Sequence, residues 1–368
     1  MLKNGIATLL SLLFTLLLLE GLVRIYYAMD DRLPPYPDPG LRDERKWAAE
    51  HIAAGEPIVN GLAGYDAMLG WREPGELEEW LERKSWNPPP VPFEDDGIER
   101  TLFLGDSFTA GLYVEPHQAF AYRFGEVHQP HGRSLNLGVS GYGLDQMLLL
   151  YEVTGVVLHA DTVVLGLYLG GFERALSGFT YYAKPRFTRN LENGILELIG
   201  QPVLTPQSLY DQYVQGKRSI GAPAGSMLWM ASTSAWQRWQ LRRAFRDEDS
   251  PAWQLFAGLL DRFAKSVIAH GDRPVLLLIP TRLEDFTGST EAELQERVIP
   301  FACGLGLTTV SLFEAFQAHL AQHPGTQLFR PREDGGHFSV HGHQLTADVL
   351  AHHLSESAPG CGHEAGKA

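Results

Sequence analysis

Five short apolar runs alternate with helical patterns from residue 100 onward, and this alternation limits the possible folds more than any other feature. The runs are TLFLGDS, SLNLGVSG, TVVLGLYLG, PVLLLIP and LTTVSLF. Strands that alternate with helices form α/β units around a mainly parallel sheet. A helix is predicted over about 251–270, with Ser250 as N-cap, Pro251 in its first turn and Gly271 just after its end. We therefore predict a three-layer α/β/α domain over residues 99–355.

An insertion at about 172–249 interrupts this alternation. Its segment KPRFTRNLENGILELIGQPV predicts a β-hairpin with its turn at residues 192–194. The following stretch contains Trp229, Trp236 and Trp239, and we expect it to be helical and to cover the site. Its tryptophans serve either packing or a platform on which a sugar ring stacks.

The first 28 residues predict an uncleaved signal anchor. The chain has no charge from Asn4 to Leu19, and the apolar stretch continues after Glu20 to a length of about 20 residues, enough to cross a bilayer. Bulky residues follow from Arg24, whereas a cleaved signal peptide ends in small residues. Lys3 favours a cytoplasmic N-terminus, so the rest of the chain is expected in the periplasm or outside the cell. Glu20 is expected either to reach the membrane–water boundary or to pair with Arg24 four residues later. Cleavage of the anchor stays open.

Residues 29–98 and 356–368 flank the predicted domain. The first segment is rich in proline and charge and predicts a stalk and N-terminal extension that packs partly on the domain. The second is a tail. Only two cysteines occur, Cys303 and Cys361, which excludes a disulfide scaffold and a multi-cysteine zinc site but leaves one optional bridge. The chain has 44 acidic and 30 basic residues, and this net negative charge argues against a nucleic-acid partner.

Ser107 is the candidate nucleophile. It lies in Gly105-Asp106-Ser107-Phe108, directly after an apolar run and before a predicted helix. A turn from strand to helix at the carboxyl edge of a parallel sheet exposes a side chain where ligands bind. The helix N-terminus there favours the negative charge that develops during acyl transfer. A turn with an ordinary helix cap is the alternative interpretation.

A nucleophilic serine needs a base and a group that orients the base. The segment Asp334-Gly335-Gly336-His337 supplies both, with Asp334 accepting from one ring nitrogen of His337 and the other nitrogen facing Ser107. An oxyanion pocket is predicted in NLGVSGYG at residues 136–143, where a glycine allows close approach of a backbone N–H.

These three segments, in this order, resemble the SGNH/GDSL hydrolase superfamily from about Arg100 to Leu354. The resemblance implies a flavodoxin-like fold with Ser107 as nucleophile, Gly138 with the Ser107 amide as oxyanion donors, and Asp334 and His337 as the remaining triad. The flanking segments GYDAMLGWREPG and HFSVHGHQLTADVLAHHL resemble its membrane-anchored bacterial branch.

One segment departs from the superfamily pattern. After the third predicted strand the superfamily has an asparagine whose amide donates to the oxyanion, and here VVLGLYLGGFERA has Gly171 at that position and Phe172 after it. Loss of one oxyanion donor costs about 10²–10³ in rate. Hydrolysis is therefore either slow or supported by another donor.

The residues and the resemblance together predict an exported, membrane-tethered serine esterase that removes O-acyl groups, acetyl above all, from a small molecule or a cell-envelope glycan. Two alternatives stay open: transfer of the acyl group to a polysaccharide by the same triad, and a catalytically weak carbohydrate-binding module. We expect no cofactor and no metal, although His337 and His341 are four residues apart. His343, His352 and His353 are expected on a helix surface.

Overall fold

The computed structural model describes residues 2–29, 39–59, 63–90, 93–190, 193–218, 226–244, 247–283 and 289–355. Its centre is a five-stranded sheet in which every neighbouring pair is parallel, with strand order β4-β3-β5-β8-β9. The strands are β3 (Arg100–Gly105), β4 (Arg133–Gly138), β5 (Thr162–Tyr168), β8 (Arg273–Ile279) and β9 (Thr308–Ser311). Each strand coincides, to within one residue at its start, with one of the five predicted apolar runs, so the predicted fold class is confirmed.

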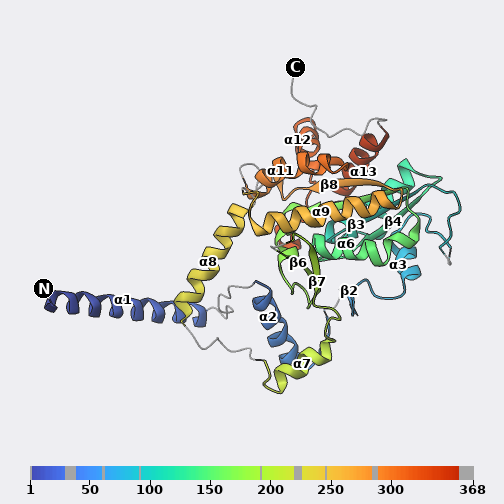
Figure 1. Ribbon diagram of the computed structural model, residues 1–368. Coiled ribbons are helices and arrows are strands. Elements are labelled where there is room, and N and C mark those ends of the chain that lie inside the picture. The colour runs from blue at the N-terminus through green and yellow to red at the C-terminus, as the bar shows by residue number, and fades with distance from the viewer. Residues whose placement is uncertain are drawn as a thin grey trace.

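Helices cover both faces of the sheet, as Figure 1 shows. Alternate residues of one strand point to opposite faces. In β3, Leu102 and Leu104 join one apolar cluster, whereas Phe103 joins the other. The first cluster includes residues of α6 (Leu144–Val153), α9 (Pro251–Ala269) and α11 (Thr290–Gly304). The second includes residues of α5 (Phe120–Arg123), α12 (Leu312–Gln322) and α13 (Val340–Ser355). The result is the predicted three-layer arrangement.

Helix α9 has the predicted ends. The Ser250 side chain accepts a hydrogen bond from the Trp253 N–H, and Pro251 occupies the first turn. Gly271, just after the helix, has a φ of +88°, a conformation that favours glycine. One face of the helix buries Phe256, Leu260 and other apolar side chains against the sheet.

The N-terminal extension packs into the domain core. Its elements are α2 (Pro39–Ala54), β1 (Gly64–Asp66), β2 (Gly70–Arg72) and α3 (Leu77–Lys84). Trp47, Trp71 and Trp80 of this segment are buried in the same cluster as the sheet. The described part of the segment expected to be a stalk therefore shares its hydrophobic core with the residues after 98.

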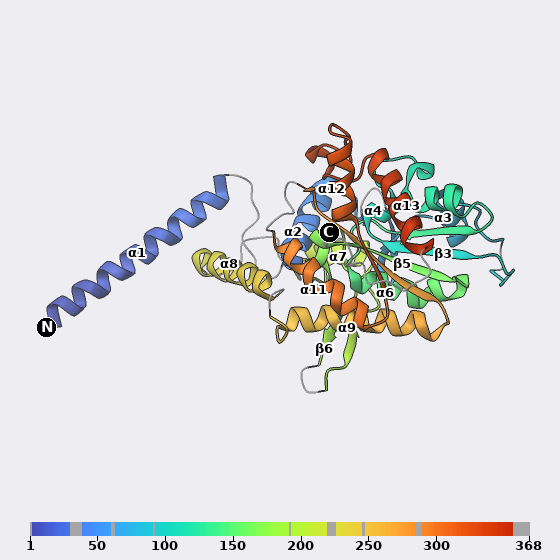
Figure 2. The same ribbon diagram turned by 90° about the horizontal axis from the view of Figure 1, so that it is seen from above.

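The insertion contains the predicted hairpin and two helices. Strands β6 (Arg186–Arg189) and β7 (Leu196–Ile199) pair antiparallel, and Gly194 in the turn has a φ of +72°. Helix α7 (Pro206–Val214) packs against α2. Helix α8 (Met227–Ala244), which the sequence predicted to cover the site, lies away from the sheet edge instead. It extends from the domain toward α1 (Leu2–Met29), which Figures 1 and 2 show projecting from the same side.

Helix α1 contains a span, Thr8–Tyr26, that is long and apolar enough to cross a membrane, and none of it is buried against the protein. Glu20 pairs with Arg24 at 2.7 Å, one of the two expected arrangements. Cys303 lies partly buried in α11. Cys361 lies outside the described residues, so its pairing with Cys303 stays a prediction.

Candidate active site

Three neighbouring strands present glycines beneath Ser107. The parallel register aligns Gly105 of β3 with Gly138 of β4 and with Gly166 of β5. A Cβ at Gly105 or Gly166 would lie 2.0 or 2.4 Å from the Thr109 hydroxyl, and one at Gly138 would lie 2.3 Å from a backbone nitrogen of the same short helix. This row of glycines lets helix α4 (Ser107–Ala110) sit directly on the carboxyl edge of the sheet. Ser107 is thereby placed where ligands bind to α/β sheets.

Ser107 and His337 are hydrogen-bonded across 230 residues of chain. The distance from the Ser107 Oγ to the His337 Nε2 is 2.8 Å. The His337 Nδ1 lies 2.8 Å from the carbonyl oxygen of Asp334. Because a carbonyl oxygen only accepts, Nδ1 carries the proton in the neutral ring and Nε2 is left to accept from the Ser107 hydroxyl. The pair therefore has the geometry of a nucleophile with its general base.

Two glycines shape the turn that carries His337. The short helix η5 (Arg332–Asp334) ends at Gly335, and Gly335 and Gly336 have φ values of +68° and +65°. A Cβ at Gly335 would lie 3.1 Å from two atoms of the His337 ring. Phe108 stacks on the same ring with centroids 4.9 Å apart. The turn and this aromatic contact together hold the imidazole against Ser107.

The carboxylate of Asp334 does not orient His337, which corrects the sequence prediction. Its Oδ2 accepts from the Arg330 guanidinium at 2.8 and 2.9 Å. The backbone carbonyl of Asp334 takes the expected role instead. The sequence correctly placed Asp334 next to the His337 ring. Because Gly335 and Gly336 between them have positive φ values, the main chain of Asp334, and not its side chain, faces Nδ1.

The predicted oxyanion donor Gly138 is also corrected. Its N–H donates to the Asn136 Oδ1 at 2.9 Å, and the Asn136 amide in turn donates to the Thr109 carbonyl at 2.9 Å. The Gly138 amide is therefore occupied by a buried contact that ties β4 to α4. Within the described residues, the amides of Ser107 and Gly141 donate to no protein acceptor. Gly141, the next glycine of the same segment, has a φ of +83°.

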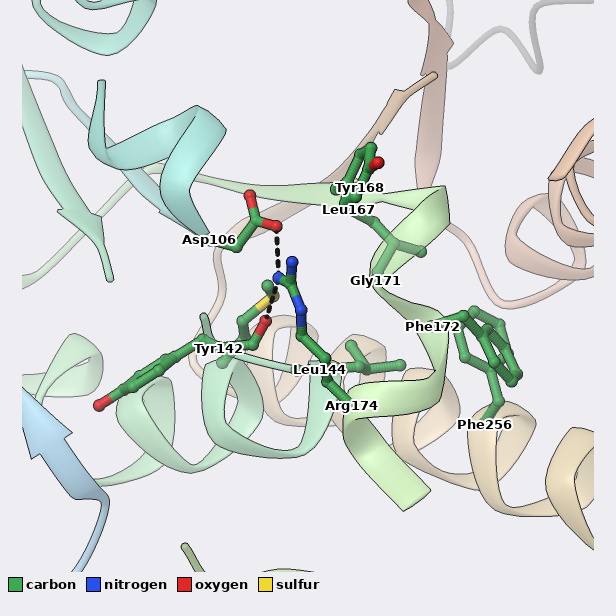
Figure 3. Close-up of a pocket in the computed structure, with 11 residues that line it drawn as sticks. Asp106, Tyr142, Leu144, Leu167, Tyr168, Gly171, Phe172, Arg174 and Phe256 are labelled. Atoms are coloured by element: carbon green, nitrogen blue, oxygen red, sulfur yellow. Dashed lines mark hydrogen bonds and ion pairs between the residues drawn. The ribbon is translucent and has the colours of Figure 1, made fainter. Parts of the chain in front are cut away.

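Arg174 fills the space beside Gly171, and sequence reasoning missed it. A Cβ at Gly171 would lie 3.0 Å from the Arg174 Cζ. The guanidinium donates to the Asp106 Oδ2 at 2.7 Å and to the Tyr142 carbonyl at 3.1 Å (Figure 3). It thus joins the residue before Ser107 to the residue after Gly141. The glycine at 171, where an asparagine was expected, was the only signal that a different side chain occupies this position.

A pocket lies beside this ion pair. It is lined by Asp106, Arg174, the end of β5 and apolar side chains of α6 and α9, and Figure 3 shows Phe172 and Phe256 against each other at one side. Its empty space, including the part open to solvent, is about 240 Å³.

Two half-exposed tyrosines lie near the Ser107–His337 pair. Tyr113 is 50% exposed, has a φ of +71°, and meets the His337 ring edge-on with centroids 5.3 Å apart. Tyr181, from the insertion, is 41% exposed and lies over Gly141, whose Cβ would be 2.7 Å from its ring. Burial raises the pKa of Tyr181, so its hydroxyl stays protonated at neutral pH.

The histidines of α13 differ in burial. His343 is fully buried rather than on the helix surface, and its Nδ1 accepts from the Phe120 N–H at 3.2 Å. His341 and His352 are exposed, and His353 is partly buried. His343 therefore links α13 to α5 beneath the site.

Comparisons with known proteins found only solved structures of low similarity. No protein-family model matches the chain, and no curated protein matches it. Among solved structures, TesA is 16% identical with a TM-score of 0.39, over 70% of this chain and 98% of that chain. The acetylxylan esterase Axe2 from Geobacillus stearothermophilus is 14% identical with a TM-score of 0.38, over 70% and 94%. LAE5, an alpha/beta hydrolase enzyme from the metagenome of Lake Arreo, is 13% identical with a TM-score of 0.39, over 69% and 94%.

These values are too low to assign an activity, so the residues of the site carry that argument. The parallel sheet, the serine on its carboxyl edge and the histidine near the C-terminus are where the resemblance to SGNH hydrolases lies.

Proposed function

We propose that this protein is a serine esterase of the SGNH type that hydrolyses small O-acyl esters. The observation that carries the proposal is the 2.8 Å contact between the Ser107 Oγ and the His337 Nε2, with Nδ1 held by a carbonyl oxygen. A serine is a weak nucleophile unless an adjacent base removes its proton. Here the base is in reach and its tautomer is set.

The reaction follows from these positions. Ser107 attacks the ester carbonyl while the His337 Nε2 takes the hydroxyl proton, and the amides of Ser107 and Gly141 donate to the carbonyl oxygen as it becomes an oxyanion. His337 then returns the proton to the alcohol that leaves. A water molecule, deprotonated by the same Nε2, attacks the acyl-serine, and the acid leaves as Ser107 regains its proton.

Arg174 compensates for the missing asparagine in this proposal. Its guanidinium ties Asp106 to Tyr142, and so sets the position of the two segments that contribute the Ser107 and Gly141 amides. The positive charge of Arg174 also lowers the free-energy cost of the negative charge that develops on the oxyanion.

The substrate is proposed to carry a small acyl group, acetyl above all, because the pocket beside Asp106 is small. Tyr113 and Tyr181 offer two half-exposed rings beside the nucleophile. Aromatic faces of this kind stack on apolar faces of larger molecules such as sugars, which supports a glycan as the alcohol part.

The domain is proposed to be tethered to a membrane by α1, with the N-terminus in the cytoplasm and the catalytic domain on the far side. The span Thr8–Tyr26 supports this, and Lys3 on the short side supports the orientation.

The test is hydrolysis of p-nitrophenyl acetate by the full chain in detergent, beside Ser107→Ala and His337→Ala. We expect a Ser107-dependent burst and an acyl-Ser107 adduct in mass spectrometry. Turnover that is equal in the native chain and Ser107→Ala, with both folded, would overturn the proposal. Product analysis with a glycan acceptor then separates hydrolysis from acyl transfer.

A further inference from the structure

The three most exposed tryptophans of the described chain all lie on α8. Trp229, Trp236 and Trp239 are 64%, 54% and 45% exposed, and the rings of Trp236 and Trp239 stack with centroids 4.6 Å apart. The other five tryptophans are buried or partly buried. A tryptophan buries 150–250 Å² when it packs, so three on one short helix leave a large apolar surface in water.

These tryptophans face away from the protein. Trp229 and Trp236 are seven residues apart and share one side of the helix. The side chains of Met227, Met230 and Ser234 are buried and lie on the opposite side by helical geometry. Helix α8 therefore uses one side to contact α1 and α9, and presents the other outward.

Glu20 of α1 fixes where α8 begins. Its Oε2 accepts from the Ser226 hydroxyl at 2.7 Å and from the Leu228 N–H at 2.9 Å, and its Oε1 accepts from the Met227 N–H at 2.9 Å. These groups are at the first turn of α8, whose backbone N–H groups have no acceptor within the helix. A carboxylate more than 200 residues away thus caps α8 together with the Ser226 hydroxyl, which accepts from the Trp229 N–H at 3.1 Å.

The position of Glu20 sets the depth of α8 relative to a bilayer. Glu20 and Arg24 lie in the last two turns of the apolar span Thr8–Tyr26, where charged groups reach the membrane–water boundary. The start of α8 is held at the same level. Tryptophan is enriched at this boundary because its ring is apolar and its N–H is polar.

The composition of α8 fits the same location. Its sequence contains three arginines and no acidic residue, although the whole chain carries a formal charge of −14. Helices that lie in the plane of a membrane interface combine basic residues with an aromatic face in this way.

We propose that α8 is an interfacial helix whose tryptophan face lies in the headgroup region of the bilayer that α1 crosses. This inference rests on the proposed membrane tether. The catalytic domain then has two membrane contacts, α1 and α8, and Glu20 fixes one against the other. The domain is held at the membrane surface in one orientation instead of moving freely on a stalk.

The first experiment measures tryptophan fluorescence of the full chain in vesicles of phosphatidylcholine and phosphatidylglycerol at 3:1, with and without brominated acyl chains. We expect brominated lipid to quench the native chain, and a Trp229→Phe/Trp236→Phe/Trp239→Phe variant to lose more than half of the quenchable signal. The matched control is Trp253→Phe, which removes a buried tryptophan, 6% exposed, and should leave the quenching unchanged. Equal quenching in the native and triple-variant chains would overturn the inference.

The second experiment tests Glu20. Glu20→Gln keeps the length of the side chain but weakens the three hydrogen bonds to the start of α8, so quenching of the α8 tryptophans should fall. Arg24→Gln is the control, because it leaves both acceptor oxygens of Glu20 in place. Unchanged quenching in Glu20→Gln would show that Glu20 does not position α8.

Two further readouts separate this inference from the proposed function. Esterase activity on p-nitrophenyl acetate in detergent should be the same for all these variants, since none lies in the active site. Release of the native chain by alkaline carbonate would instead show that the tether itself is wrong. If the chain stays in the membrane but its α8 tryptophans are not quenched, and chemical cross-linking gives dimers through α8, a second copy of the chain covers the face and the interfacial helix is excluded.

Discussion

The imidazole of His337 is oriented by the main chain of Asp334 and not by its carboxylate. Nδ1 lies 2.8 Å from the carbonyl oxygen, while the carboxylate pairs with Arg330. The candidate active site is therefore a Ser107–His337 pair with a backbone acceptor, and in the proposed mechanism the carboxylate contributes to local structure.

Asp334→Asn should consequently reduce kcat/KM by less than about tenfold, whereas a carboxylate that contacts the catalytic ring is worth about 10⁴. The variant keeps the carbonyl acceptor and loses only a partly exposed ion pair. His337→Ala, the reference, should lose about 10⁴-fold or more. Steady-state hydrolysis of p-nitrophenyl acetate measures both, and an Asp334→Asn loss as large as that of His337→Ala would show that the carboxylate turns to the ring.

Gly335→Ala should reduce activity by about 10²-fold, because the added Cβ lies 3.1 Å from the His337 ring and small misplacements of a catalytic group cost that much. Gly216→Ala is a matched control. Gly216 has the same φ of +68° as Gly335, and nothing lies within 4 Å of its Cβ. Both variants carry the same backbone strain, so only the effect on kcat should differ. Equal activity in the two would mean that the turn does not position His337.

The ion pair between Arg174 and Asp106 should affect both stability and rate. Asp106 is 1% exposed, so Arg174→Met leaves a buried carboxylate unpaired and should cost about 3–5 kcal/mol of unfolding free energy. The double variant Asp106→Asn/Arg174→Met keeps an oxygen that accepts from the Phe108 N–H and should regain most of that stability. It should stay about 10-fold or more below native kcat, because the positive charge is still absent. Urea unfolding and ester hydrolysis of the three chains test this, and native activity in the double variant would remove Arg174 from the proposed mechanism.

The buried pair of Lys184 and Asp145 should anchor the insertion to α6. Both side chains are at most 1% exposed and are directly hydrogen-bonded. Burial raises the pKa of Asp145 and lowers that of Lys184, so each charge depends on its partner. Lys184→Met should cost about 3–5 kcal/mol, and Lys184→Met/Asp145→Leu should be close to native. Unfolding of the single and double variants in urea decides this; additive losses would contradict it.

Stability should fall at mildly acidic pH because of His343. Burial, and to a smaller extent the charges of His337 and Arg123, lower its pKa from 6.5 to about 3. Between these values the unfolded chain binds a proton that the folded chain does not, so this residue's contribution is fully present above pH 6.5. It is lost by up to about 1.4 kcal/mol per pH unit as the pH falls toward 3.

His343→Gln keeps an acceptor for the Phe120 N–H but does not titrate, so its unfolding free energy should change less between pH 7 and pH 5 than that of the native chain. Parallel pH dependence in the two chains would show that His343 does not contribute. His341→Gln, at an exposed position of the same helix, is the control.

Local patterns in the sequence were enough to predict the sheet, α9 and the hairpin, and they pointed to Ser107 and His337 as the candidate nucleophile and base. These features depend on local periodicity, caps and turn residues, which neighbouring positions reveal. Gly105 and Gly138 also mark strand ends that the alternation of apolar runs predicts.

Which atoms meet depends on how distant segments are placed. The carbonyl of Asp334 replaces its carboxylate because Gly335 and Gly336 turn the main chain, and the Gly138 amide is taken by Asn136. Arg174 occupies the space beside Gly171, and Glu20 caps α8 over more than 200 residues. Such contacts depend on the relative placement of segments distant in the chain, and no local pattern of residues encodes that placement.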